Sequence, residues 1–270
     1  MIEMIRSVFL GIVQGLTEFL PVSSSGHLNI MPWLFKWDNI SESFDLALHA
    51  GTLLAILIYF FKDWISLLRG GFNMAVKKEK TAEGRIFWYI VAATVPAGVL
   101  GLVLEKVIEK LTGDNMNLQM LIISLALIVM GIILYIADKR CKSSTKYEDI
   151  NFKQGFLVGI SQAVAAGIPG VSRSGITMTV ARSMGIERES AAKYSFMLSA
   201  PIVAAAVLLS IGEFDLSLSF VAGVLSSFIS GMLVIKFLMS FLKKGSFKIF
   251  AIYRVVFGAI ILGIAIFRIM

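Results

Sequence analysis

Six apolar segments, each about 18 to 20 residues long, constrain this chain most, because a helix of that length crosses the ~30 Å hydrocarbon core of a bilayer. They cover residues 44–61, 87–104, 118–137, 194–211, 218–237 and 250–267. Hydrophobic residues make up 57% of the 270 and charged residues only 16%, which is more apolar surface than a soluble domain buries. We therefore predict an all-α polytopic membrane protein with a single integral membrane domain, residues 1–270.

Two further apolar stretches, 5–32 and 154–181, are too long for one span and are interrupted by Pro, Gly and Ser at 21–26 and 169–175. Irregular backbone at membrane depth persists only where protein or a water-filled cavity satisfies its polar groups. We predict that each stretch forms a re-entrant helical hairpin. The first stretch lacks a signal-peptide cleavage pattern, so we expect it to be retained.

The net charge of +7 indicates topology rather than nucleic-acid binding, because the Lys and Arg residues gather in short loops. Four basic loops lie at 62–85, 139–153, 182–193 and 243–248. All four share one side of the membrane only if both interrupted stretches are re-entrant, and the positive-inside rule makes that side cytoplasmic. The first stretch then enters from outside and the second from the cytoplasm.

The two interrupted stretches also share an ordered pattern. Residues 11–14, Gly-Ile-Val-Gln, match Gly-Ile-Ser-Gln 148 positions later, and Pro21 matches Pro169 at the same offset. After one inserted residue, Val-Ser-Ser-Ser-Gly at 22–26 matches Val-Ser-Arg-Ser-Gly at 171–175. We predict two inverted-topology repeats, about 1–140 and about 150–270, each with one hairpin and three transmembrane helices. Discontinuous helices in corresponding positions predict a binding site where the two breaks meet, near the midplane.

Polar residues suited to phosphate chemistry gather at these breaks. The first break offers Ser23, Ser24, Ser25 and His27 after Gln14 and Glu18, and the second offers Ser172, Arg173, Ser174 and Thr177. A charge at membrane depth costs roughly 2.5–3.5 kcal/mol, so Glu18 and Arg173 need each other or a ligand. Serine at a helix start often only caps it, which accounts for one or two of the set. Two helix N-termini, an arginine and a serine near a base together favour phosphoryl transfer.

Other polar or helix-breaking residues receive a structural interpretation. We expect His49 to be structural inside its helix, Arg254 to extend toward the membrane interface, and Pro96 and Pro201 to kink spanning helices. With Cys141 as its one cysteine, the chain offers no intrachain disulfide, and the Cys and His spacing offers no zinc site.

A family resemblance rests on two signatures. Residues 14–27, Gln-Gly-Leu-Thr-Glu-Phe-Leu-Pro-Val-Ser-Ser-Ser-Gly-His, and 169–177, Pro-Gly-Val-Ser-Arg-Ser-Gly-Ile-Thr, resemble those of the bacterial undecaprenyl-diphosphate phosphatase, or bacitracin-resistance, family. The likeness extends to 48–52 and 195–201. It implies hydrolysis of undecaprenyl diphosphate to undecaprenyl phosphate and inorganic phosphate, which recycles the lipid carrier for peptidoglycan and envelope glycans and confers bacitracin resistance. It implies a location in the bacterial cell membrane, and the predicted topology turns the site to the extracytoplasmic side.

The resemblance also implies roles for individual residues. Glu18, Ser24, His27 and Arg173 correspond to catalytic positions, with Ser24 as nucleophile and His27 as base, acid or nucleophile. Ser23, Ser25, Ser172, Ser174 and Thr177 would bind phosphate. A divalent cation, Mg²⁺ or Ca²⁺, would be held by Glu18 and Gln14. Many relatives carry Glu at position 14, but magnesium needs only one or two carboxylates when phosphates and waters complete its shell.

The expected partners are a polyprenyl diphosphate substrate and membrane lipid, and we expect no nucleic-acid partner. The sequence leaves open whether the protein forms a homodimer. A transporter is the main alternative, because paired broken helices in inverted repeats also build transport sites. Reactive Ser beside Glu and His favours the phosphatase. A purely structural scaffold would leave Glu18, Arg173 and the doubled serine pattern without a purpose.

Overall fold

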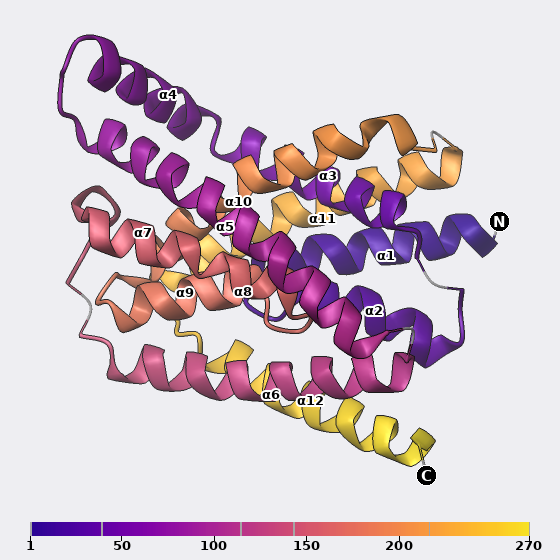
Figure 1. The fold of residues 1–270 in the computed structure, drawn as a ribbon. Coiled ribbons are helices and arrows are strands. Elements are labelled where there is room, and N and C mark those ends of the chain that lie inside the picture. The colour runs from indigo at the N-terminus through magenta and orange to yellow at the C-terminus, as the bar shows by residue number, and fades with distance from the viewer. Residues whose placement is uncertain (1, 39, 114, 143, 216, 270) are drawn as a thin grey trace.

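The computed structural model describes residues 2–38, 40–113, 115–142, 144–215 and 217–269, which are almost entirely helical (Figure 1). Six helices in this part of the chain are long and apolar enough to span a membrane. They are α3 (Glu42–Tyr59), α5 (Ala82–Thr112), α6 (Met116–Arg140), α10 (Arg188–Ser210, extended by the 3-10 turn η2, Ile211–Glu213), α11 (Leu218–Leu242) and α12 (Lys248–Ile269). The prediction of a helical protein with six helices of membrane-spanning length and apolarity is confirmed.

Short polar side chains set where several helices begin. Ser41 Oγ accepts a hydrogen bond from Phe44 N at the start of α3, and Asn151 forms a reciprocal capping box with Gln154 at the start of α7 (Phe152–Ile160). The α3 helix ends at Tyr59, and Phe60 alone separates it from α4 (Phe61–Val76). Much of the first basic loop of the sequence analysis is therefore a helix.

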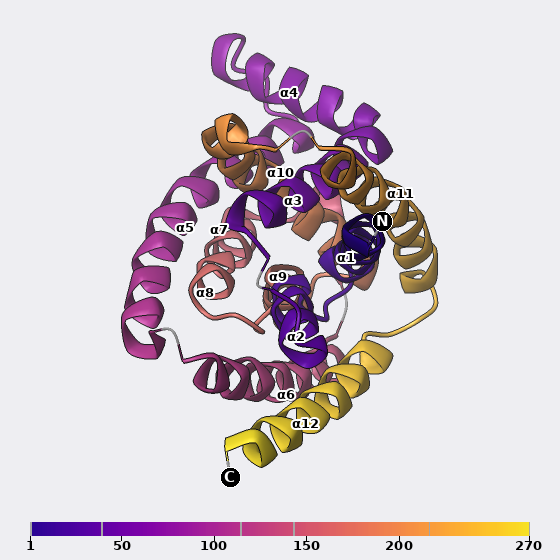
Figure 2. The ribbon, with the colours of Figure 1, turned by 90° about the vertical axis from the view of Figure 1, so that its right-hand side faces the viewer.

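Each interrupted stretch is divided into shorter helices. The first forms α1 (Ile2–Phe19) and α2 (Ser24–Phe35). The second forms α7 (Phe152–Ile160), α8 (Gln162–Gly167) and α9 (Arg173–Ser183), and η1 (Tyr147–Asp149) precedes it. The second stretch thus breaks twice, at Ser161 and again at 168–172, where the sequence suggested one interruption. Seen end-on, α2, α8 and α9 lie inside a ring formed by the longer helices (Figure 2).

The inner helices pack closely because their contact faces consist of small residues. The α1 helix lies along α11, and α7 and α8 lie along α5. A Cβ atom added to Gly15 of α1 would lie 2.5 Å from the carbonyl oxygen of Ser227 and 2.6 Å from the backbone nitrogen of Gly231. Glycine at this position therefore lets the backbones of α1 and α11 touch.

A buried carboxylate joins four elements at the opposite end of α9 from the break. Asp138 Oδ1 accepts hydrogen bonds of 2.8 Å from Nε of both Arg182 and Arg188, and Oδ2 accepts one of 3.1 Å from Phe247 N. Arg182 also donates to the carbonyl of Ile186 at 2.6 Å. The ends of α6 and α9, the start of α10 and the connection before α12 are thereby fixed together.

We predict that Gly15→Leu separates α1 from α11 and lowers the thermal unfolding temperature in detergent. Overpacking a tight contact typically costs about 1–3 kcal/mol, and here the clash is with backbone atoms. Gly98→Leu is the matched control, because a Cβ at Gly98 would have no atom within 4 Å. Equal unfolding temperatures for the two variants would contradict this account of the interface.

Candidate active site

The two breaks have the same local geometry. Ser23 and Ser172 both precede a helix with positive φ angles of 77° and 72°, a conformation that is uncommon for non-glycine residues. The Ser23 hydroxyl accepts a hydrogen bond of 3.2 Å from Gly26 N, and the Ser172 hydroxyl one of 3.0 Å from Gly175 N. These two serines are therefore helix caps, as the structural interpretation of one or two serines predicted.

The breaks also meet, as the sequence analysis predicted. Arg173, the first residue of α9, donates from Nη2 to Oε1 of Glu18 near the end of α1. Ser174 donates to the carbonyl oxygen of Leu20 at 3.1 Å. Two segments about 150 residues apart in the sequence thus form one site. Side chains of the second break hold them together by contacting Glu18 and the Leu20 carbonyl of the first.

Glu18 is the centre of this site, and its side chain is only 6% exposed. Its Oε2 atom accepts a hydrogen bond of 2.5 Å from the Ser24 hydroxyl and one of 3.3 Å from Gln14 Nε2. The bond from Ser24 is short, as charge-assisted O–H···O bonds are, and it holds the carboxylate against the Ser24 oxygen. A carboxylate so placed can accept the proton of that hydroxyl.

His49 has a place in this site that the sequence analysis did not give it. Its Nε2 atom lies 3.6 Å from Glu18 Oε2, while Nδ1 lies 2.9 Å from the carbonyl oxygen of Asp45. The backbone bond orients the ring so that Nε2 faces the carboxylate. The structural interpretation of His49 therefore stays a prediction, although the residue contacts the central acid.

Arg254 also differs from its expected position. Its side chain is fully buried and does not reach the interface. It donates to carbonyl oxygens on both breaks and on α6, namely those of Pro21, Gly170, Val171, Ala126 and Leu127, at 2.9–3.4 Å. Carbonyls freed by the breaks provide a rigid set of acceptors inside the protein, and they satisfy this guanidinium better than the interface would.

The remaining predicted site residues face different directions. His27 packs against the rings of Tyr253 and Phe257, and its nitrogens lie 2.7 Å from the Ser23 carbonyl oxygen and the Tyr253 hydroxyl. Thr177 lies 2.7 Å from the hydroxyl of Ser195 on α10. The hydroxyl oxygens of Ser25 and Ser23 lie 3.4 Å apart. The structure thus brings Ser24 and Arg173 onto Glu18, whereas the contacts of His27 and Thr177 go to α12 and α10.

Two buried polar atoms beside Glu18 have no hydrogen-bond partner among the described residues. They are Oε1 of Gln14, an acceptor, and Nη1 of Arg173, a donor. The acceptor and the Glu18 carboxylate are oxygen donors of the kind that Mg²⁺ and Ca²⁺ prefer, whereas the free guanidinium N–H suits a phosphate oxygen. In the described part of the chain no cluster of three or more His, Cys, Asp or Glu side chains could hold a metal alone, so a cation here would take further ligands from substrate and water.

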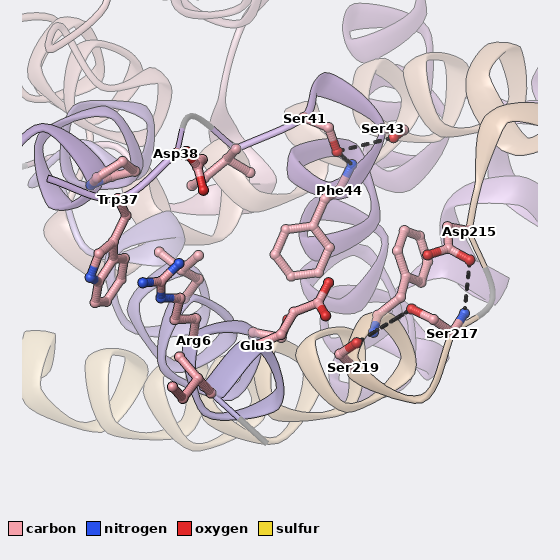
Figure 3. A pocket seen from close by; sticks show the side chains of 16 residues that line it. Glu3, Arg6, Trp37, Asp38, Ser41, Ser43, Phe44, Asp215, Ser217 and Ser219 are labelled. Carbon is pink, nitrogen blue, oxygen red and sulfur yellow. Dashed lines mark hydrogen bonds between the residues drawn. The ribbon is translucent and has the colours of Figure 1, made fainter.

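A cavity of about 530 Å³ lies apart from these residues, at the ends of the helices where the chain begins (Figure 3). The starts of α1, α3 and α11 line it, and Ser41 and Ser43 at the start of α3 face Ser217 and Ser219 at the start of α11 across it. Arg6 stacks over Trp37 at 5.1 Å. Leu10 and Phe44 line its wall. Leu10 lies one helical turn before Gln14 on α1, and Phe44 directly precedes Asp45 on α3.

The fold and the site define a polytopic helical membrane protein with a buried Glu–Arg–Ser centre built on two broken helices. The chain belongs to the family described as bacitracin resistance protein BacA, whose sequence model matches residues 7–260. It is 47% identical to an undecaprenyl-diphosphatase of Desulforudis audaxviator over 266 residues, which cover 97% of this chain and 98% of the relative. Undecaprenyl-diphosphatases of Moorella thermoacetica and Caldicellulosiruptor bescii are each 43% identical, over 96% and 97% of this chain and 97% and 98% of the relatives.

We predict that Arg254→Leu lowers the thermal unfolding temperature strongly and abolishes activity, because it leaves the carbonyls of both breaks without a donor. Each unsatisfied buried carbonyl costs about 1–3 kcal/mol. Arg254→Lys restores the charge but cannot reach all the acceptors, so we expect an intermediate effect. Arg69→Leu serves as the control at an exposed arginine, and a similar loss there would contradict the role assigned to Arg254.

Proposed function

We propose that this protein hydrolyses undecaprenyl diphosphate to undecaprenyl phosphate and inorganic phosphate. That reaction would recycle the lipid carrier for peptidoglycan and envelope glycans and confer bacitracin resistance. The relatives named above carry the name of this activity. The observation that carries the proposal is the Glu18 carboxylate, which is bonded at once by the Ser24 hydroxyl and the Arg173 guanidinium.

In the proposed first step, Ser24 Oγ attacks the terminal phosphorus while Glu18 accepts the hydroxyl proton. A bond forms between Ser24 Oγ and phosphorus, and the bond from phosphorus to the bridging oxygen breaks, so that undecaprenyl phosphate leaves with the electron pair. The Nη1 atom of Arg173 binds a phosphate oxygen, and the first backbone N–H groups of α2 and α9 add positive potential. Such preorganised donors stabilise charge in phosphoryl transfer.

In the proposed second step, water attacks the seryl phosphate. The bond between Ser24 Oγ and phosphorus breaks, Glu18 returns its proton to Ser24 Oγ, and both protons of the water stay with the released phosphate. Ser23, Ser25, Ser172, Ser174 and Thr177 would line the phosphate site. The role of His27 as base, acid or nucleophile stays a prediction, because its ring nitrogens contact Ser23 and Tyr253.

We propose Glu18 and Gln14 as the protein ligands of a divalent cation, Mg²⁺ or Ca²⁺. The free Oε1 atom of Gln14 supports this assignment. Such an ion would supply charge neutralisation for the diphosphate. The Arg173 guanidinium on the other carboxylate oxygen then keeps Glu18 oriented toward Ser24.

We also propose two inverted repeats, α1–α6 and α7–α12, that form one membrane domain with two re-entrant hairpins. The equivalent caps at Ser23 and Ser172 support this proposal. The helix pairing supports it too, because α1 packs on α11 as α7 packs on α5, and α3 packs on α11 as α10 packs on α5.

In this arrangement the site opens to the extracytoplasmic face of a bacterial cell membrane, and the prenyl tail lies in lipid. The cavity whose lining includes Leu10 and Phe44 lies at the end of the helices that this topology turns outward. A homodimer is compatible with this arrangement, since the site uses residues of one chain.

The test is phosphate release from undecaprenyl diphosphate by purified protein, with and without EDTA. We expect Ser24→Ala and Glu18→Gln to lose ~10²–10⁴-fold in kcat, because they remove the nucleophile and its base. Arg173→Lys should lose at least about tenfold, because a lysine cannot bind Glu18 and phosphate through one planar group. Ser183→Ala, at an exposed serine on the far end of α9, is the matched control, and unfolding temperatures verify folding.

No phosphate release by folded wild-type protein would overturn the proposal. If the same protein moved a labelled polyprenyl phosphate between leaflets, transport would replace it. Full activity of Ser24→Ala would exclude Ser24 as nucleophile, and full activity in EDTA would exclude the cation. Trapping of phosphate on Ser24 would establish the covalent step.

We predict that His49→Leu lowers kcat about tenfold to hundredfold with little change in KM, because an apolar group then faces the buried Glu18 carboxylate. His49→Gln keeps a polar side chain beside Glu18 and should retain more activity than His49→Leu. The measurement is steady-state kinetics on folded variants. Identical kinetics of His49→Leu and wild type would show that the contact with Glu18 has no catalytic effect.

A further inference from the structure

The α4 helix carries an apolar face that no part of the described chain covers. Its members are Phe61, Ile65, Leu68, Phe72 and Val76, and each is 46–63% exposed. Their spacing of three and four residues places them along one side of the helix. We call this set the α4 stripe. At 16 residues, α4 is too short to span a bilayer alone.

The orientation of the α4 stripe is fixed by the contacts of the other side of α4. Gly70 and Gly71 pack against Gly84 and Phe87 of α5, and the carbonyl of Gly71 accepts a hydrogen bond of 3.2 Å from Trp88 Nε1. Near the start of α4, Asp63 pairs with Lys193 of α10 at 2.6 Å. Because these contacts attach α4 along its length, the α4 stripe faces away from the protein.

Three exposed lysines, Lys77, Lys78 and Lys80, follow directly after the α4 stripe, in the turn that leads to α5. We call them the basic tip. The acid between them, Glu79, accepts a hydrogen bond of 3.1 Å from Asn73, and Glu83 is exposed on the first turn of α5. Nothing among the described residues pairs with the three ammonium groups in a salt bridge, so they remain available to an outside anion.

We propose that the α4–α5 hairpin binds anionic phospholipid, with the α4 stripe among acyl chains and the basic tip on the head-group phosphates. An apolar helix face that ends in several lysines matches the two layers of a leaflet. Each lysine near an anionic surface adds favourable electrostatic energy, and the aliphatic part of its side chain reaches up from the apolar region. This lipid site is separate from Glu18 and does not depend on the proposed phosphatase activity.

The test measures which lipids surround the hairpin in the intact protein. A donor fluorophore is placed at Ala75→Cys in a Cys141→Ser background and reconstituted in phosphatidylcholine vesicles that contain some phosphatidylglycerol. Acceptor-labelled phosphatidylglycerol and, separately, acceptor-labelled phosphatidylcholine report local enrichment by energy transfer. Lys77→Gln/Lys78→Gln/Lys80→Gln removes the basic tip. Lys243→Gln/Lys244→Gln/Lys248→Gln, at three exposed lysines before and at the start of α12, is the control with the same loss of charge.

We expect transfer to phosphatidylglycerol several-fold above transfer to phosphatidylcholine, and this preference should weaken as salt is added. It should disappear in the basic-tip variant and persist in the control. Phe72→Gln, in the α4 stripe, should lower transfer to both lipids. Equal transfer to the two lipids in the unmodified hairpin, or an equal loss of preference in both triple variants, would overturn the proposal.

Discussion

The buried ion pair of Glu18 and Arg173 is the interaction on which the rest of the site depends. Each charge alone would be costly at membrane depth, and removing one partner of a buried pair typically costs about 3–5 kcal/mol. Glu18 lies at the end of α1 and Arg173 at the start of α9, so the pair sets the distance between the two breaks. Ser24, Gln14 and His49 then contact the same carboxylate.

Two further arginines hold α9 and the breaks in the position that this pair requires. Arg182 binds Asp138 at the end of α9, and Arg254 binds carbonyls on both breaks from behind. Helix α9 is thus fixed at both ends by charged groups inside a largely apolar protein. A catalytic geometry needs supporting residues of this kind, because a shift of about 1 Å in a reacting group can cost ~10²-fold in rate.

The sequence predicts the parts of this structure that bilayer thickness determines. Six spanning helices follow from the lengths of apolar segments, and the cost of isolated charge predicts that Glu18 and Arg173 each have a partner, either each other or a ligand. Helix α4 was missed because Lys62, Asp63, Arg69 and two glycines interrupt its apolar periodicity, and its glycines pack closely against Gly84 of α5. Ser161 gave no sign of a second break.

Arg254 was misplaced because its partners are backbone carbonyls, which a sequence does not display. A usable signal existed, since a lone arginine inside an apolar segment is more often functional than interfacial. The sequence signal for His49 was weaker. His49 follows Asp45 by four residues, so both side chains lie on one face of α3, and that face points toward Glu18.

The charges around the breaks explain why an anion is the natural ligand of this site. Glu18 and Arg173 pair with each other, and the Asp45 carboxylate lies 3.7 Å from His49, whereas Arg254 contacts carbonyl oxygens and no carboxylate among the described residues. The N-termini of α2 and α9 both begin at the breaks and add partial positive charge there. These N-termini and the unpartnered Nη1 atom of Arg173 therefore offer hydrogen-bond donors to an anion beside Ser24. A diphosphate would accept hydrogen bonds from these donors, and because its lipid tail can stay in the membrane, the enzyme needs to remove only the head group from water.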